Sequence, residues 1–395
     1  MVRSRTKAVK TTDAGKNKEA EGVRYFDYSL LAILIFLVCF GLVMLYSTSA
    51  YSALVNYGDS MYYFRRQLIF ILIGFAALFF ITRFDYHSFA KYARLLYIFA
   101  IILMALVLTP LGREVNGARR WLSLPFGASF QPSEVAKVAV ILFIPVLICQ
   151  MGKEIQTFRG SMRIVLLWGG FTALCVYFLT DNLSTAIIVL GMVCIMVFVV
   201  HPKTWPFVAA AGGIAAAAII GINVLLINMS NSGSFRLNRI IAWLHPEEYA
   251  SGSAYQTLQG LYAIGSGGFF GKGLGNSAQK AIIPEVQNDM ILTIICEELG
   301  ICGVIIVLAL FAMLLYRLMF IARNAPDMYG SLIVTGIFAH IALQVIFNVG
   351  VVTNTIPNTG ITLPFISYGG TSVAILLAEM GIALSVSRQI TFEEE

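Results

Sequence analysis

The chain has 395 residues, of which 58% are hydrophobic and 12% charged, with a mean hydropathy of +0.81 and a formal net charge of +6. A soluble domain carries roughly twice that charged fraction, so the composition excludes a soluble globular protein and indicates a polytopic membrane protein. The positive charge does not indicate nucleic-acid binding, because seven of the 27 Lys and Arg residues lie in the first 24 positions, where a basic tail before a membrane helix is typical of a topology signal.

Residues 1–27 are polar and charged, and we expect them to form a disordered cytoplasmic tail. Residues 28–388 are predicted to form an all-α membrane domain, and residues 389–395 a second cytoplasmic tail. Apolar runs in this domain lie close to the length needed to cross a bilayer, and we expect the long run at 290–322 to tilt or to extend beyond it. The ten predicted transmembrane helices are 28–47, 66–82, 92–111, 134–151, 163–180, 184–200, 205–229, 290–322, 329–352 and 365–387.

The distribution of basic residues predicts the orientation of this domain. Ten spans place both termini on the same side of the membrane. With the N-terminus inside, the segments on that side hold most of the Lys and Arg residues, which agrees with the positive-inside rule. Two loops then face outward and are too long to be simple connections: residues 112–133, and a large loop at 230–289. Long loops without a domain of their own are often functional.

Four of the 21 acidic residues lie in the stretch "PEVQNDMILTIICEELG", residues 284–300. Asp289 precedes the eighth predicted helix, where an Asp either caps the helix or acts as a general base that stays ionised beside the helix N-terminus. Glu285 lies four residues earlier and would share its face if the stretch is helical. Glu297 and Glu298 lie inside the apolar run, where an ionisable side chain is either functional or hydrogen-bonded to a neighbouring helix.

Basic residues in the outward loops indicate an anionic ligand. Arg suits phosphate because its planar donor fork makes paired hydrogen bonds, and Arg119 and Arg120 precede Trp121 in the shorter loop. The large loop holds Arg236, Arg239, Lys272 and Lys280, although long loops retain such charges without a functional reason. Its stretch "AIGSGGFFGKGLGNSAQK" is rich in glycine, which lets backbone approach a phosphate or sugar closely.

Three long motifs resemble the SEDS family, which includes the FtsW, RodA and SpoVE proteins of bacterial cell-wall synthesis. They are "NGARRWLSLPFGASFQPSEVAKVAVILF" (116–143), "RLNRIIAWLHPEEY…AYQTLQGLYAIGSGGFFGKGLGNSAQKAIIPEVQNDMILTIICEELG" (236–300) and "NTGITLPFISYGGTS" (358–372). The last motif is more similar to FtsW or SpoVE than to RodA, and the N-terminal tail points the same way. One departure is "DNLSTA", where the family often has "PDLGTA": Asn182 stands in place of the Asp.

The resemblance implies a glycosyltransferase of the bacterial plasma membrane that polymerises lipid II, an undecaprenyl-pyrophosphate disaccharide-pentapeptide, at the outer face, for the division septum. It implies one displacement with inversion, a class B penicillin-binding protein and other division-complex membrane proteins as partners, and no nucleic acid. No metal site is predicted, although a divalent cation, Mg²⁺ or Mn²⁺, could assist the leaving pyrophosphate. The catalytic residue is Asp289, and the candidate substrate-binding residues are Glu285, Lys280, Arg119, Arg120, Trp121, Lys137, Arg236, Arg239, Lys272, Gln256 and Ser367.

Two other functions fit the same features. A lipid II flippase would use a similar cavity and similar anionic-lipid contacts without bond chemistry, but it should line a path from both membrane faces with polar residues. The polar residues of this chain concentrate in the outward loops, which favours the enzyme. A scaffold that only recruits the crosslinking enzyme is the second alternative, and reconstitution with lipid II separates the three.

Overall fold

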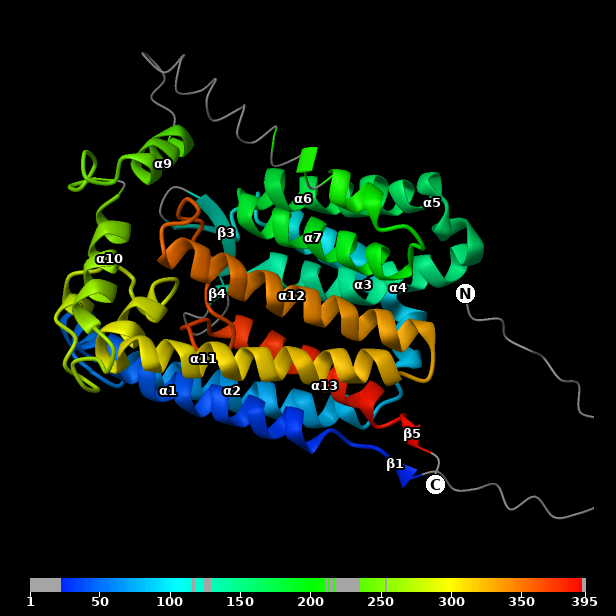
Figure 1. The fold of residues 1–395 in the computed structure, drawn as a ribbon, viewed down its shortest axis with the longest axis horizontal. Helices are drawn as coiled ribbons and strands as arrows, with labels where there is room; N and C mark the ends of the chain where they lie inside the picture. Colours follow the sequence, from blue (N-terminus) through cyan, green and yellow to red (C-terminus); the bar gives the residue numbers. More distant parts are fainter. Residues whose placement is uncertain are drawn as a thin grey trace, which may run out of the picture.

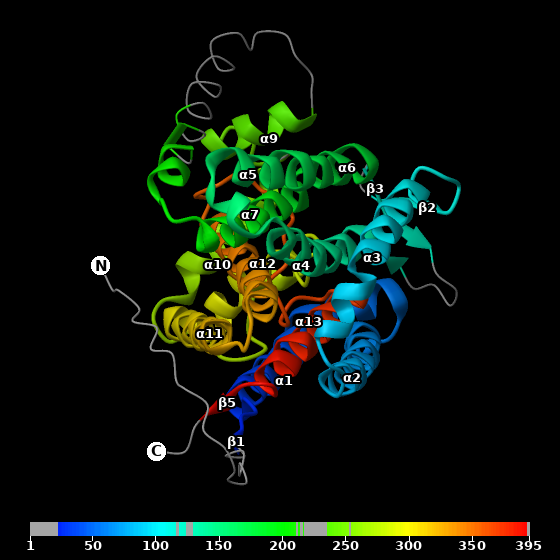
Figure 2. The ribbon, with the colours of Figure 1, turned by 90° about the vertical axis from the view of Figure 1, so that its right-hand side faces the viewer.

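The structure, a computed structural model, describes residues 23–115, 118–123, 129–210, 212–213, 216, 235–252 and 254–392. The chain forms a bundle of helices aligned along one long axis (Figures 1 and 2). In the bundle α13 packs against α2, α11 against α12, and α3 against α4. The helices are α1 (Tyr28–Tyr57), α2 (Tyr62–Thr82), α3 (His87–Leu106), α4 (Pro132–Met151), α5 (Phe158–Arg163), α6 (Phe171–Thr180), α7 (Leu183–Val200), α9 (Phe235–Leu244), α10 (Tyr255–Gly267), α11 (Ile291–Asn324), α12 (Met328–Val352) and α13 (Thr371–Ser387).

In the described part of the chain, eight helical segments are long and apolar enough to cross a membrane. They correspond to α1, α2, α3, α4 with the 3-10 turn Gly152–Gln156, the continuous run Phe158–Thr180, α7, α11 and α12. The run Phe158–Thr180 joins α5 to α6 through a π-helical segment, Ile164–Gly170. These segments confirm eight of the predicted spans and the all-helical polytopic class.

The structure describes one of the other two predicted spans and only a small part of the second. The tenth is the shorter apolar helix α13, which begins at Thr371 and not at residue 365. Pro364 and the Gly369–Gly370 pair precede it, and Gly370 has a φ of +48°, which interrupts the helix. The seventh, 205–229, lies largely outside the described residues, so the total of ten stays a prediction.

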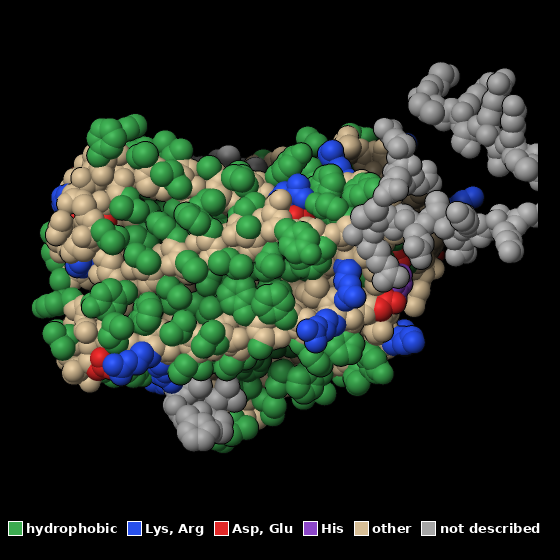
Figure 3. Space-filling view, turned by 90° about the horizontal axis from the view of Figure 1, so that it is seen from below, with side chains coloured by type: hydrophobic (Ala, Val, Ile, Leu, Met, Phe, Trp, Pro, Cys, Tyr) green, Lys and Arg blue, Asp and Glu red, His purple; other side chains and the backbone are tan. Residues whose placement is uncertain are grey.

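The side of the bundle has the character expected of a surface in contact with lipid. Figure 3 shows hydrophobic side chains covering the middle of one face, with Lys and Arg gathered toward the two ends of the long axis. Around the bundle, large apolar residues such as Phe80, Leu95 and Phe178 are more than 60% exposed. A band of this kind is stable only when lipid and not water covers it.

Both ends of the described chain lie at one end of the bundle. Strand β1 (Val23–Arg24) pairs with β5 (Thr391–Phe392), and Asp27 caps α1 while forming an ion pair of 2.8 Å with Arg317 of α11. This pairing agrees with termini on the same side of the membrane. Residues 23–27 of the predicted tail therefore belong to the folded domain, and residues 1–22 lie outside the described part.

A small antiparallel sheet, which we call the outer sheet, forms in the first of the two loops that were predicted to face outward, where the sequence predicted no strand. It consists of β2 (Gly112–Val115), β3 (Ala118–Ser123) and β4 (Ser129–Phe130) in the order β2-β3-β4. The loop then enters α4 with Pro132 in its first turn, where a missing N–H costs no helical hydrogen bond. The sheet holds the start of α4 and the basic pair Arg119–Arg120 at the same end of the bundle.

Helix α11 is broken at Gly300, which explains how a run longer than one span is accommodated. Gly300 has a φ of +71° and a ψ of −174°, so the residues on either side form two helical pieces. The N–H groups of Ile301 and Cys302 donate to the carbonyls of Gly268 and Phe269, and the carbonyls of Glu297 and Glu298 accept from the N–H groups of Lys272 and Gly273. The glycine-rich segment (residues 268–280) thus supplies the hydrogen bonds that the broken helix lacks.

The glycines in this contact allow two backbones to touch. A Cβ on Gly300 would lie 2.2 Å from the Phe269 carbonyl oxygen, and one on Gly271 would lie 2.2 Å from that of Glu298. Both residues also have positive φ, which only glycine adopts at low cost. The glycine content of this segment, in which the sequence suggested a phosphate contact, is therefore explained by packing against α11.

Candidate active site

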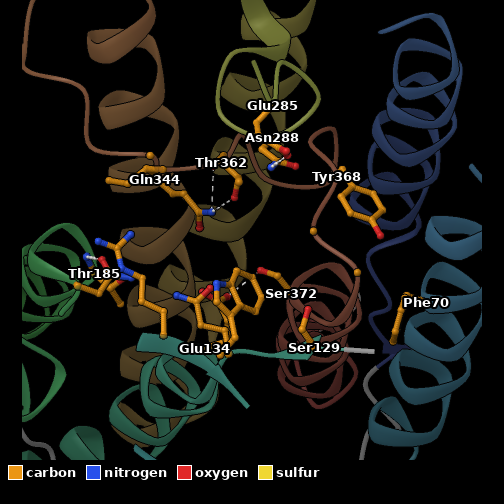
Figure 4. Close-up of a pocket in the computed structure, with 18 of the residues that line it drawn as sticks. Phe70, Ser129, Glu134, Thr185, Glu285, Asn288, Gln344, Thr362, Tyr368 and Ser372 are labelled. Atoms are coloured by element: carbon orange, nitrogen blue, oxygen red, sulfur yellow. Dashed lines mark hydrogen bonds between the residues drawn. The ribbon is translucent and has the colours of Figure 1, made fainter. Parts of the chain in front are cut away.

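A cavity of about 390 Å³ lies where α1 ends and α2 begins. Figure 1 shows this end of α1 far from the paired strands β1 and β5. The cavity wall comes from segments far apart in the sequence: the end of α1 and the start of α2, the outer sheet, the first turns of α4 and α7, the turn before α11, and the segment between α12 and α13. Figure 4 shows Glu285 and Asn288 on one side of the cavity and Glu134 with Ser372 on the other. The lining is mostly polar or aromatic, as expected of a site for a polar ligand.

Asp289 lies beside this cavity, at a position where it is 8% exposed. The side-chain amide of Gln256 on α10 donates to its Oδ1 over 3.1 Å, and Asn348 of α12 donates to its backbone carbonyl over 2.8 Å. Gly360 lines the cavity next to it, and a Cβ on Gly360 would lie 3.8 Å from Asp289 Oδ2. The absence of a side chain at Gly360 keeps this approach to the carboxylate open.

Asp289 does not occupy the N-cap position that the sequence suggested for it. Helix α11 begins at Ile291, its N-cap is Met290, and that side chain makes no capping hydrogen bond. The stretch 284–289 is a series of turns, with Glu285 at a φ of +49°, so Glu285 and Asp289 do not share a helix face. Glu285 is exposed, lines the cavity, and accepts from Asn288 over 2.9 Å.

Cationic side chains also line the cavity. Arg120 and Trp121 of β3 line it as the sequence predicted, and Arg120 donates to the carbonyl of Asp181 over 3.0 Å. Lys137 is 2% exposed and forms an ion pair of 2.9 Å with Glu134, which also accepts from Ser372 over 2.9 Å. A buried ion pair with this extra hydrogen bond is held rigidly at the cavity wall.

Two further arginines, Arg66 of α2 and Arg113 of β2, line the cavity and were not among the predicted site residues. Arg66 donates to the hydroxyl of Tyr62 over 2.6 Å. Both arginines lie on the outward side of the predicted topology, against the positive-inside rule. Their exception to that rule was the sequence feature that could have identified them as site residues, and Arg120 is an exception of the same kind.

Tyr368, in the segment before α13, also faces the cavity. Burial raises the pKa of its phenol, although the positive charge of Arg66 acts in the opposite direction. The hydroxyl therefore stays neutral at physiological pH and is able to donate a hydrogen bond to an anionic ligand.

The "DNLSTA" turn before α7 connects two parts of the cavity wall, the start of α7 and the segment between α12 and α13. Asn182 lines the cavity and caps α7 by accepting from the N–H of Thr185 over 3.1 Å. Ser184 donates to the carbonyl of Thr359 over 3.0 Å, on the segment that holds Gly360. An Asn caps a helix about as well as an Asp, so the departure from the family wording preserves this turn.

Lys272 and Lys280 do not line the cavity. Each forms an ion pair with a fully buried glutamate of α11: Lys272 with Glu297 over 2.6 Å, and Lys280 with Glu298 over 3.4 Å. Glu298 also accepts from Ser47 of α1 over 2.6 Å. The two glutamates inside the apolar run thus hold the glycine-rich segment, which agrees with their structural alternative.

The other predicted residues take separate places. Arg119 is exposed and pairs with Glu114 over 3.5 Å, and it does not line the cavity. Ser367 is buried, and its hydroxyl accepts from the N–H of Leu363, closing a turn beside the cavity. Gln256 contacts Asp289, as described above. The side chains of Arg236 and Arg239 lie outside the described part of the structure.

The described residues contain no group of three or more His, Cys, Asp or Glu side chains that could hold a metal ion. Whether the reaction uses the Mg²⁺ or Mn²⁺ that the sequence allowed is not part of the proposal below, which rests on the side chains of the described residues.

The fold and the cavity define a multi-pass membrane protein with an acidic turn and cationic side chains around one polar site. A family of cell cycle proteins that groups FtsW, RodA and SpoVE matches residues 28–391. The stage V sporulation protein E of Bacillus subtilis is 40% identical, covering 92% of this chain and 97% of the relative. A probable peptidoglycan glycosyltransferase FtsW of Trichlorobacter lovleyi is 36% identical, covering 92% and 93%.

Solved structures agree with these relatives. A chain of a peptidoglycan synthase complex, from work on the coordination of polymerization and crosslinking, aligns with a TM-score of 0.74 at 27% identity, covering 92% of this chain and 98% of that one. The rod shape determining protein RodA of Thermus thermophilus aligns with a TM-score of 0.63 at 27% identity, covering 92% and 97%. The chain belongs to the FtsW/RodA/SpoVE family, the SEDS proteins.

Proposed function

We propose that this protein is a peptidoglycan glycosyltransferase that polymerises lipid II at the outer face of the bacterial plasma membrane. Relatives at 34% and 36% identity that are named as probable peptidoglycan glycosyltransferases support the reaction class. The observation that carries the proposal is the cavity itself, which joins an acidic turn to a wall holding Arg66, Arg113, Arg120 and Lys137. A sugar hydroxyl and a pyrophosphate need these two kinds of side chain within one site.

Asp289 acts as the general base in this proposal. Its carboxylate takes the proton from the 4-hydroxyl of the acceptor sugar, and the oxygen attacks the anomeric carbon of the donor. The new bond between oxygen and carbon forms as the bond from that carbon to the pyrophosphate breaks, so the configuration inverts. Undecaprenyl pyrophosphate leaves, and the proton passes from Asp289 to solvent. A single general base contributes about 10²–10⁴-fold to such a rate.

The cationic side chains stabilise the leaving group. Negative charge grows on the pyrophosphate as the bond breaks, and preorganised donors lower the energy of that state. Arg66, Arg113 and Arg120 present guanidinium groups, which form paired hydrogen bonds with phosphate oxygens. Tyr368, whose hydroxyl stays protonated, supplies one further donor at the same wall.

The proposal includes a partner and a cellular role. The likeness to a chain of a peptidoglycan synthase complex supports pairing with a class B penicillin-binding protein, which would crosslink the new strand. The proposed role is work at the division septum, with other membrane proteins of the division complex; the wording of "ITLPFISYGGTS" and the N-terminal tail support a protein more like FtsW or SpoVE than like RodA.

The test of this function is glycan polymerisation from labelled lipid II by purified variants. Asp289→Asn keeps the hydrogen bond from Gln256 but cannot accept a proton, so we expect a loss of at least about 10²-fold in rate with unchanged thermal stability. Asp289→Glu keeps the carboxylate and moves it by one methylene, and we expect partial activity. Glu285→Gln should lose less, because Glu285 supports the charge of the site without taking the proton.

A parental rate for Asp289→Asn would disprove the assigned base. If the parent forms no glycan, and the parent and the variant move lipid II between the leaflets of a vesicle at the same rate, the protein is a flippase and not a glycosyltransferase. If neither activity is present with or without the crosslinking partner, the scaffold alternative holds.

A further inference from the structure

A chain of three hydrogen bonds runs from the backbone to the carboxylate of Asp289. The N–H of Gly360 donates to Asn358 Oδ1 over 3.0 Å, and Asn358 Nδ2 donates to Gln256 Oε1 over 3.0 Å. Gln256 Nε2 then donates to Asp289 Oδ1 over 3.1 Å and to the carbonyl of Pro284 over 3.2 Å. The residues come from α10, from the turn before α11 and from the segment after α12, and only the fold brings them together.

Backbone groups fix the direction of both amides in this chain. An amide side chain has a donor end and an acceptor end that are nearly identical in shape, so its orientation depends on its partners. The backbone nitrogen of Gly360 can only donate, which turns the oxygen of Asn358 toward it and the NH₂ group toward Gln256. The carbonyl of Pro284 can only accept, which turns the NH₂ group of Gln256 toward the Asp289 side. The two ends of the chain therefore require the same arrangement.

We propose that Asn358 is a positioning residue for the transfer reaction, because it acts together with the carbonyl of Pro284 to orient the amide of Gln256 so that a donor faces the carboxylate of Asp289. This inference rests on the proposed role of Asp289 as the base. A hydrogen bond to the ionised form favours that form, so the arrangement keeps the base ready to accept a proton. It also holds Oδ1 in place, which fixes the direction in which the carboxylate approaches its substrate.

Asn348 of α12 holds the backbone on both sides of the same arrangement. It is fully buried, and its Nδ2 donates to the carbonyl of Asp289 and to the carbonyl of Ile361, each over 2.8 Å. The backbone of the base and the backbone next to Gly360 are thus joined through one side chain. Because Asn348 holds backbone and Asn358 holds the amide, their loss should have different consequences: Asn348 affects stability, and Asn358 affects the chemistry.

Other charged or titratable groups near Asp289 also influence how the reaction rate depends on pH. Glu285 lies in the same turn, and Tyr368 lies in the segment before α13. The remaining charged groups that line the cavity in the described part of the chain are Arg66, Arg113, Arg120, Glu134 and Lys137. None of these is changed by the variants below, so their contribution is the same in each comparison.

The experiment measures lipid II polymerisation by purified protein as a function of pH for Asn358→Ala, Gln256→Met and the double variant. With Asn358→Ala we expect kcat to fall roughly tenfold, about the effect of one hydrogen bond, with KM unchanged. The acidic limb of the pH–rate profile should move up by about one unit, because losing a donor destabilises the ionised carboxylate. Gln256→Met should do the same. The double variant should resemble Gln256→Met alone, since Asn358 acts through that amide.

Asn56→Ala is the matched control, because Asn56 lies exposed at the same end of the bundle and bonds only to Ser52 of its own helix among the described contacts. If Asn358→Ala does not fold, Asn358→Ser can still accept from Gly360 but does not reach Gln256, and it carries the same expectation. Additive effects in the double variant, or an unchanged pH profile, would overturn the role of Asn358. Activity in Asp289→Asn would instead overturn the base itself, so the two failures are distinguishable.

Discussion

Replacing Lys272 with Met distinguishes the structural role of this lysine from the phosphate contact that the sequence suggested. Glu297 is fully buried, and Lys272 lies 2.6 Å from its Oε1 while 36% of the lysine side chain stays exposed. Breaking a buried ion pair costs about 3–5 kcal/mol when one charge is left without a partner. The exposure of Lys272 and the N–H donors of Ala278 and Gln279, which remain on Glu297, reduce the expected cost to about 1–3 kcal/mol.

The expected effect is local and can be measured by hydrogen exchange. The N–H groups of Lys272 and Gly273 donate to carbonyls at the break of α11, so they exchange only when the glycine-rich segment opens. A loss of 1–3 kcal/mol corresponds to about 5- to 150-fold faster exchange in a peptide covering residues 268–280. Lys91→Met, at an exposed position on α3, is the matched control and should leave this exchange unchanged.

A double variant completes the test. Glu297→Gln removes the buried charge, so Lys272→Met should add little exchange in that background, giving a coupling between the two sites. The reasoning is refuted if Lys272→Met leaves exchange of the segment unchanged and raises KM for lipid II. That outcome would return Lys272 to the substrate contacts.

Two further predictions concern the cavity and its orientation. Arg66→Ala should raise KM for lipid II about tenfold or more. Arg66→Lys should recover part of this loss, since lysine keeps the charge without the planar donor fork. Equal KM values in the parent and both variants would show that Arg66 does not bind the substrate. In a cysteine-free background, a Cys at the exposed position Ser251 should react with an impermeant maleimide in intact cells, and one at Lys153 only after permeabilisation; the reverse pattern would place the cavity inside.

The sequence by itself determined the class of protein and much of the helix arrangement. Hydrophobic runs of membrane-spanning length depend on local composition, so eight spans could be located before any contact was known. The motifs around Asp289 and Arg120 likewise indicated the family, because they are contiguous stretches of sequence. Asp289 could be selected as an acid at a helix boundary, a position that allows capping or catalysis, and the resemblance to the family motif then predicted catalysis.

The tertiary structure decided which polar residues meet. Lys272 and Lys280 looked like phosphate contacts because they are basic and outward, yet they pair with Glu297 and Glu298, whose burial creates the need for a positive partner. Arg66 and Arg113 reach the cavity only because the start of α2 and the outer sheet lie beside it. Asn358, Gln256 and Asp289 are separated by up to 102 residues, and no local pattern indicates hydrogen bonds between such distant positions. Local composition fixes what enters the membrane, whereas the pairing of polar groups depends on long-range packing.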